Sequence, residues 1–132
     1  MLHRAQHFDL AEVVTECVRS VEPAARGRGT RISVDAEGPL PVTLPRVAVV
    51  RALDLLLERA TFEAAGPVVV RLSREPSHDA VMVAYASTAG GPTVALEASE
   101  IVSALGGRLV NEGGKVPRLV LMLPREDVVA GL

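Results

Sequence analysis

The chain has 132 residues, of which 48% are hydrophobic and 2% aromatic, so it is long enough for one domain with a core of small aliphatic side chains. Its 14 basic and 16 acidic residues give a formal charge of −2, which removes the general electrostatic attraction on which nucleic-acid binding depends. No segment has the roughly 20 consecutive apolar residues of a membrane-spanning helix, and the N-terminus lacks the apolar core of a secretion signal. We expect a soluble, cytoplasmic protein that binds no nucleic acid and does not insert into a membrane.

The first half of the chain predicts a helix, a strand, an extended segment and a second helix. From Phe8 to about Ala25, apolar side chains recur at spacings of three and four, which is typical of a helix with one buried face, and Asp9 is placed to cap it. The alternating stretch TRISVDAEG indicates a half-buried strand. Prolines in GPLPVTLP predict an extended segment without pairing inside a sheet. The largely apolar residues 46–65 should form the central helix.

The second half predicts two hairpins separated by a helix. The stretches PVVVRLSRE and DAVMVAYAS are joined by a short PSH turn, so these two strands should pair antiparallel. A loop containing TAGGPT leads into the helix VALEASEIVSALGG, which a glycine pair ends. The strands RLVNE and RLVLMLP complete the order.

This order of elements predicts an α+β fold. Antiparallel hairpins with interspersed helices favour a two-layer sandwich, in which a mixed, mostly antiparallel sheet is covered on one face by about three helices. We assign residues 1–7 to an N-terminal extension, residues 8–124 to the domain and residues 125–132 to a C-terminal tail.

The phrases FDLAEVV, ALDLLLERA, VMVAYAST and EIVSALGGRL occur in this order with characteristic spacing. Together they resemble the catalytic ATP-binding domain of bacterial sensor histidine kinases, a GHKL-type ATPase domain. The likeness covers about Phe8 to Pro124, which is nearly the whole chain. It implies the sandwich described above and a role in bacterial two-component signalling.

The resemblance also implies a magnesium site, from which the sequence departs. In the family, the central helix carries an Asn-Leu-Leu-(Asp or Glu)-Asn-Ala pattern, and its second amide coordinates Mg²⁺. Here Leu55 and Arg59 stand at the two amide positions, while Glu58 keeps the acidic one. A guanidinium has no free lone pair and is always positively charged, so Arg59 cannot replace the missing oxygen ligand.

The adenine and phosphate contacts of the family are altered as well. In its Asp-x-Gly-x-Gly pattern the carboxylate binds the adenine amino group; here that position is Ser87, the first glycine is Ala89, and only Gly91 remains. The long phosphate-covering lid is reduced to GGPTV. Three such losses, each worth about 1–3 kcal/mol, would take a micromolar ligand to millimolar or beyond. We therefore expect no useful ATP or Mg²⁺ binding, no other cofactor, no metal site and no catalytic residue.

A cleft that has lost its lid must be filled by side chains or left as exposed apolar surface, and such a surface often marks a partner site. We expect Phe62 to pack into the vacated cleft, and Arg59, Phe62, Thr88 and Val94 to border a partner surface. The sequence thus favours a non-catalytic protein-interaction or regulatory module. Its partner would be a response regulator, another kinase or an upstream helical dimerisation module, and a homo-oligomer is a further option.

Other functions stay open at this point. One is a diverged histidine kinase or ATPase domain that still binds nucleotide. Another is the C-terminal domain of a histidine phosphotransfer protein, which would need a histidine-bearing helical pair, and a third is a structural dimerisation domain.

Several single residues have simpler explanations. We expect Arg59 to pair with Glu63 four positions on, and Cys17 to be a buried small residue. His3 and His7 lack a third ligand, so a metal site there is not expected.

Overall fold

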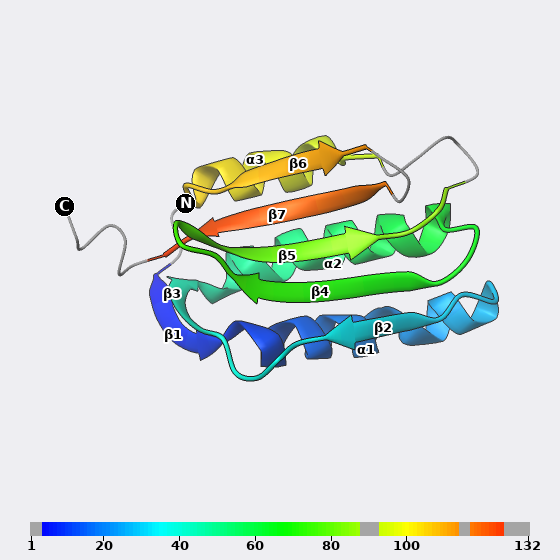
Figure 1. The fold of residues 1–132 in the computed structure, drawn as a ribbon, viewed down its shortest axis with the longest axis horizontal. Helices are drawn as coiled ribbons and strands as arrows, with labels where there is room; N and C mark the ends of the chain where they lie inside the picture. The colour runs from blue at the N-terminus through cyan, green and yellow to red at the C-terminus, as the bar shows by residue number, and fades with distance from the viewer. Residues whose placement is uncertain (1–3, 88–92, 114–116, 126–132) are drawn as a thin grey trace.

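The computed structural model describes residues 4–87, 93–113 and 117–125, which form a two-layer α+β domain (Figure 1). The elements follow in the order β1 (Ala5–Asp9), α1 (Leu10–Gly27), β2 (Ile32–Asp35), β3 (Pro41–Pro45), α2 (Arg46–Glu63), β4 (Val68–Arg74), β5 (His78–Ala84), α3 (Leu96–Ala104), β6 (Arg108–Glu112) and β7 (Arg118–Pro124).

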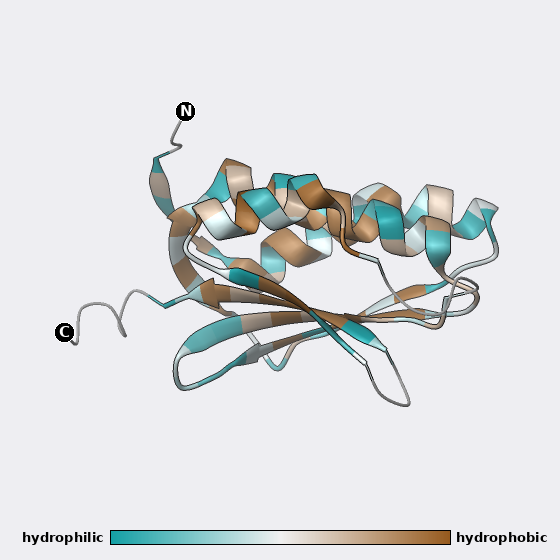
Figure 2. Cartoon of the chain, turned by 90° about the horizontal axis from the view of Figure 1, so that it is seen from above, coloured by the Kyte–Doolittle hydropathy of each residue, from teal (hydrophilic) through white to brown (hydrophobic). Residues whose placement is uncertain are grey.

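The main sheet has five strands in the order β2-β4-β5-β7-β6. The β2–β4 pair is parallel and the other three pairs are antiparallel, so the sheet is mixed and mostly antiparallel. All three helices lie on one face of it, with α2 between α1 and α3, and the opposite face carries no helix (Figure 2). The predicted two-layer architecture is confirmed.

The core lies between the helices and the sheet. The buried stripe of α1 is the one that the sequence spacing predicts, consisting of Leu10, Val13, Val14, Cys17, Val18, Val21 and Ala25. Fully buried Leu and Val side chains of α2, β4, β5 and β7 complete it, and each contributes about 1.5–3 kcal/mol relative to an exposed position. None of the helices in the described residues has the length and apolarity needed to span a bilayer.

A separate two-stranded antiparallel ribbon, β1 with β3, lies at one end of the sheet. The fold therefore begins at Ala5, earlier than the helix start expected near Phe8. The proline-rich stretch also differs from expectation, because β3 is paired, although only with β1 and outside the main sheet. The carboxylate of Asp9 joins the ribbon to α1, since Oδ1 accepts from Ala11 N at 3.0 Å and from Leu40 N at 2.8 Å.

Candidate functional site

The residues that align with the nucleotide site lie where α2 ends, where the chain leaves β5, and where it approaches α3. Ala64 and Ser87 form an isolated antiparallel bridge, and Ala65 N donates to Ala86 O at 2.8 Å. These contacts fix Ser87 beside the end of α2. Ala89, Gly91 and Thr88 lie outside the described residues.

The helix positions that align with the family's magnesium-binding residues lie on α2. Leu55 is half-buried and packs against the hydrophobic core, and Glu58 is exposed. Arg59, whose side chain is 44% exposed, reaches across to the segment before α3, where Nη1 donates to Thr93 Oγ1 at 3.0 Å. The structure therefore directs Arg59 towards the segment before α3.

Glu63, in the last turn of α2, is the centre of this contact. Its Oε1 accepts from the hydroxyl of Tyr85 at 2.7 Å and from the backbone N–H of Thr93 at 3.1 Å, while Oε2 accepts from the Thr93 hydroxyl. The Nη1 atom of Arg59 lies 3.8 Å from Glu63 Oε2, which is the predicted pair between residues four apart. We refer to Arg59, Glu63, Tyr85 and Thr93 as the Glu63 cluster.

The electrostatics of the Glu63 cluster fix its protonation state. Burial alone would raise the pKa of Glu63, but the hydrogen bonds from Thr93 and Tyr85 and the charge of Arg59 outweigh it, so the pKa is lowered. Burial, and then the hydrogen bond to Glu63, raise the pKa of Tyr85. Near neutral pH the carboxylate is thus charged and the phenol protonated. The carboxylate therefore accepts and the phenol donates, which holds the end of α2 to the residue after β5.

The sequence reasoning missed most of this cluster. The pair between Arg59 and Glu63 was predicted, but Tyr85 and Thr93 lie 22 and 30 residues from Glu63 along the chain. No local pattern identifies such partners. The one available signal was a tyrosine directly after an apolar strand, because a buried phenol usually needs a hydrogen-bond partner.

The prediction that Phe62 packs into the vacated cleft is wrong. Its side chain is 71% exposed, and the guanidinium of Arg28 lies 4.9 Å from the ring centroid. The Nη2 atom of Arg28 also donates to Phe62 O at 3.0 Å. Phe62 stands on the outward face of α2, away from the buried stripe, and the polar Glu63 cluster instead joins the end of α2 to Thr93. Val94, also predicted near the partner surface, is half-buried against the core.

Titratable residues elsewhere offer no alternative centre. Cys17 is buried, and burial with the neighbouring charge of Asp54 raises its pKa to about 12, so its thiol is inert. His7 shares a hydrogen bond of 2.7 Å with Thr43, and His3 lies outside the described residues. In the part of the chain that the structure describes, no three His, Cys, Asp or Glu side chains are grouped to hold a metal.

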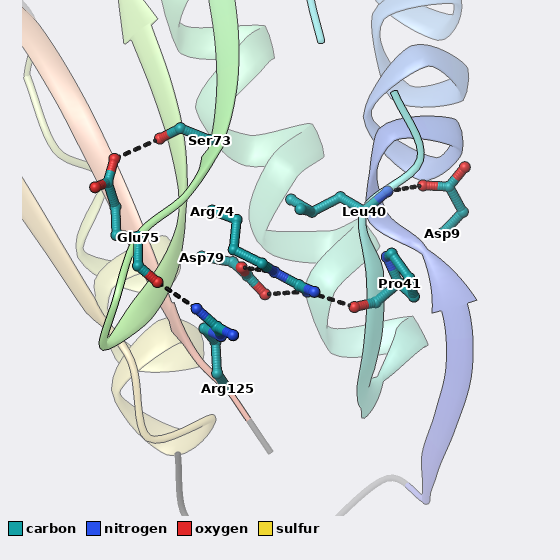
Figure 3. A network of polar contacts seen from close by, with 8 residues as sticks. All are labelled: Asp9, Leu40, Pro41, Ser73, Arg74, Glu75, Asp79 and Arg125. Carbon is teal, nitrogen blue, oxygen red and sulfur yellow. Dashed lines mark hydrogen bonds and ion pairs between the residues drawn. The ribbon is translucent and has the colours of Figure 1, made fainter. Parts of the chain in front are cut away.

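A pocket of about 580 Å³ lies at the end of the sheet beside the β1–β3 ribbon. Its one buried carboxylate, Asp79, is taken up by Arg74, which donates from Nε at 2.8 Å and from Nη2 at 3.1 Å (Figure 3). Arg74 Nη2 also donates to Pro41 O at 2.6 Å, so the charges in this pocket hold the ribbon to the sheet. The arrangement is structural, and the candidate site remains the Glu63 cluster at the end of α2.

Comparison with family models and with curated protein sequences finds no match. Solved structures do match. The histidine kinase AdeS of Acinetobacter baumannii is similar over 96% of this chain and 70% of its own, with a TM-score of 0.80 and 15% identity. The mycobacterial sensor histidine kinase MprB is similar over 92% of this chain and 97% of its own, with a TM-score of 0.73 and 18% identity.

Full-length ShkA, solved in complex with AMPPNP, is similar over 95% of this chain and 32% of its own, with a TM-score of 0.77 and 18% identity. Identities this low establish the fold alone. The chain has the fold of a histidine kinase catalytic domain, the GHKL-like ATPase fold that the sequence resemblance implies.

Proposed function

We propose that this histidine-kinase-type ATPase fold serves as a non-catalytic protein-interaction or regulatory module in two-component signal transduction. The observation that carries the proposal is Arg59, a permanent cation at the position of the family's magnesium-binding amide, bonded across the cleft to Thr93. ShkA was solved with AMPPNP, so the fold itself can hold a nucleotide. The residues of this chain, and not its fold, would therefore account for a loss of nucleotide binding.

The chemistry of Arg59 supports the loss of magnesium binding. Mg²⁺ requires oxygen ligands in octahedral geometry, and it bridges the phosphates to the protein. A guanidinium offers five N–H donors and no lone pair, and it repels a cation. Leu55, at the first amide position, is packed against the core and offers no replacement.

The Glu63 cluster supports the proposal from the other side of the cleft. A nucleotide that approached α2 here would meet the segment containing Thr93, which Glu63 holds through backbone and hydroxyl hydrogen bonds. Displacing it would remove the two hydrogen bonds that Glu63 accepts from Thr93, at a cost of about 1–3 kcal/mol. The cluster thus stabilises a closed cleft that needs no ligand.

The partner surface in this proposal is the outward side of α2 and α3. Three large apolar side chains are exposed there, Val47, Phe62 and Leu96, the last two by more than 70%. Arg51 of α2 and Glu97 of α3 form an ion pair of 2.6 Å, which places the two helices side by side. A response regulator, another kinase or a helical dimerisation module would contact this surface, where Arg59 and Phe62 are both accessible.

Calorimetric titration tests the loss of nucleotide binding. The protein at about 50 µM is titrated with ATP and with ADP in the presence of Mg²⁺, with full-length ShkA and AMPPNP as the positive control. We expect no saturable heat below about 1 mM, because the three lost contacts together weaken binding about a thousandfold or more. Saturation at low micromolar concentration would refute the proposal.

One observation favours a second function, namely nucleotide binding without magnesium. The guanidinium of Arg59 is 44% exposed and has the planar donor geometry that recognises phosphate. If it held a nucleotide directly, binding would persist in EDTA and disappear in Arg59→Gln, which removes the charge and keeps a polar side chain. Under our proposal, neither EDTA nor the Arg59→Gln substitution changes the heat of the nucleotide titration.

A further inference from the structure

The outward face of α2, which points away from the sheet, carries a stripe of exposed side chains. We call it the α2 stripe, and it consists of Val47, Arg51, Glu58 and Phe62. Successive helical residues turn by about 100°, so spacings of four, seven and four residues place the stripe within about 60° around the helix. The four side chains therefore form one face, with an apolar residue at each end and opposite charges between.

A third exposed apolar residue, Leu96 of α3, lies beside the middle of the α2 stripe. The end of α2 contacts the segment before α3 and the first half of α2 contacts Glu97, so the two helices run antiparallel. Leu96 precedes Glu97 and is 73% exposed. Among the described residues, the exposed large hydrophobic side chains are Val47, Phe62 and Leu96, and all three lie on this side of the domain. Exposed apolar residues grouped among charges indicate a protein contact.

The two charged residues of the α2 stripe retain the capacity to bind charges from outside. The Glu58 carboxylate makes no ion pair or hydrogen bond with any residue that the structure describes. Arg51 donates to Glu97 Oε2 from Nε at 3.0 Å and from Nη2 at 2.6 Å, so its Nη1 atom still offers donors. The Arg51 side chain is also 56% exposed. Both groups can therefore pair with a charge on a partner.

We propose that a second copy of the chain binds the α2 stripe through its own α2 stripe, with the two α2 helices antiparallel around a two-fold axis. The axis runs across the helices at the level between Asp54 and Leu55, the midpoint of the stripe. Two-fold symmetry makes the contact self-complementary, so each pairwise contact occurs twice. The inference names the partner of the surface given in the proposed function, and it rests on that proposal for the role of the contact.

The order of residues along the α2 stripe selects this arrangement. Arg51 and Glu58 lie at equal distances from the axis on opposite sides, so Arg51 of each copy faces Glu58 of the other. Val47 and Phe62 are also at equal distances from the axis, so the exposed valine of each copy packs on the exposed ring of the other. Leu96 lies close to the level of the axis and meets its counterpart. Opposite charges and apolar side chains are thus matched along the whole stripe.

Other registers lose this match. A shift of one helical turn in one direction places Val47 opposite Glu58, and the same shift in the other direction places Phe62 opposite Arg51. The acidic residue beside the axis does not oppose the contact, because Asp54 is half-buried and faces Cys17 of α1. Its charge is therefore turned away from the α2 stripe.

Charge reversal on α2 tests the proposal by sedimentation velocity between about 1 and 500 µM, a range that covers weak association. We expect the wild-type protein to form a dimer. Arg51→Glu places like charges together at two symmetric contacts, as does Glu58→Arg, so each variant alone should dimerise at least about tenfold more weakly. An equimolar mixture of the two variants restores both charge pairs and should dimerise within about threefold of the wild type.

Two further variants keep the test decisive. Arg108 is exposed and pairs with Met122, which lies between buried residues of β7, so Arg108→Glu makes the same charge change on the sheet face opposite the helices and should leave dimerisation unchanged. Phe62→Ala should weaken dimerisation, and mixing it with another variant should not restore it.

A wild-type protein that stays monomeric at the highest concentration overturns the proposal. A dimer that the two charge variants on α2 do not weaken, while circular dichroism shows them folded, overturns it as well. Neither result changes the calorimetric titration with nucleotide, so a failure of this proposal is distinguished from a failure of the proposed function.

Discussion

An arginine and a carboxylate close the sheet at both of its ends, but the two pairs differ in burial and in what they hold. Beside the β1–β3 ribbon, Asp79 is 1% exposed and is held by Arg74, which also binds the backbone of Pro41 (Figure 3). At the other end, the Glu63 side chain is 11% exposed and Arg59 is 44% exposed. One pair is part of the packed frame, whereas the other lies at the surface of a cleft.

The difference separates a contact between elements of the sheet from one that holds a single segment. The Arg74–Asp79 pair connects β4, β5 and β3, all of which are elements of the sandwich itself. The Glu63 cluster instead connects α2 to the short segment that stands where the family has its lid. Breaking the Arg74–Asp79 pair should therefore lower the stability of the whole domain. Breaking the Glu63 cluster should mainly release the segment that contains Thr93.

The largest loss of unfolding free energy is expected for Arg74→Ala. Removing the guanidinium leaves the carboxylate of Asp79 buried without its ion pair, which costs about 3–5 kcal/mol in comparable buried pairs. Urea unfolding followed by circular dichroism measures the change in the free energy of unfolding. Arg71→Ala is a matched control on the same strand, because its partner Asp35 is exposed and the loss should stay under about 1 kcal/mol. Equal losses of unfolding free energy in Arg74→Ala and Arg71→Ala would mean that water reaches Asp79 and replaces its ion pair.

An intermediate effect is expected for Glu63→Ala. The Tyr85 hydroxyl loses its acceptor and Thr93 loses both of its contacts to the carboxylate, which should cost about 1–3 kcal/mol. Hydrogen exchange should quicken at the Thr93 amide while the β4–β5 pairing stays protected. Tyr85→Phe is the control, since it removes one hydrogen bond and leaves Thr93 held. Unchanged exchange at Thr93 in Glu63→Ala would show that other contacts hold this segment.

The contribution of Glu63 to stability should depend on pH. The pKa of Glu63 is lowered from its ordinary value of 4.5, so its contribution to stability is complete above about that pH and is lost as the pH falls through the folded-state pKa. The difference in urea midpoint between the wild type and Glu63→Gln should therefore be constant from pH 7 to about pH 5 and shrink towards pH 3. A difference that grows on acidification would contradict the assigned direction.

The frame was predictable from the sequence because its signals are local. The spacing of Val13, Val14, Cys17 and Val18 predicts α1, and two alternating runs around a short turn predict the β4–β5 hairpin. The β1–β3 pairing was not predictable in this way, because it joins residues about 36 positions apart and β1 is too short for a periodic pattern.

The site was less predictable than the frame. Its alignment identified Arg59 and Ser87, but the contacts that close the cleft join segments 22 to 34 residues apart. The error at Phe62 has a physical cause, since an aromatic residue was expected to fill a vacancy that hydrogen bonds close instead. The exposed ring lies under Arg28, which binds the end of α2 from α1. Helix periodicity was the better guide, because Phe62 is off the stripe formed by Leu53, Leu56, Leu57 and Ala60.

The smallest effect on stability is expected for Arg59→Ala, although Arg59 carries the functional proposal. Its side chain is largely solvated, its distance to Glu63 is 3.8 Å, and isolated exposed pairs contribute about 0–1 kcal/mol. The urea midpoint should barely move, and Thr93 should stay bound to Glu63. A loss above about 2 kcal/mol would place Arg59 in the frame with Arg74. A small loss would mean that folding places little demand on this position, so stability alone would not explain an arginine there.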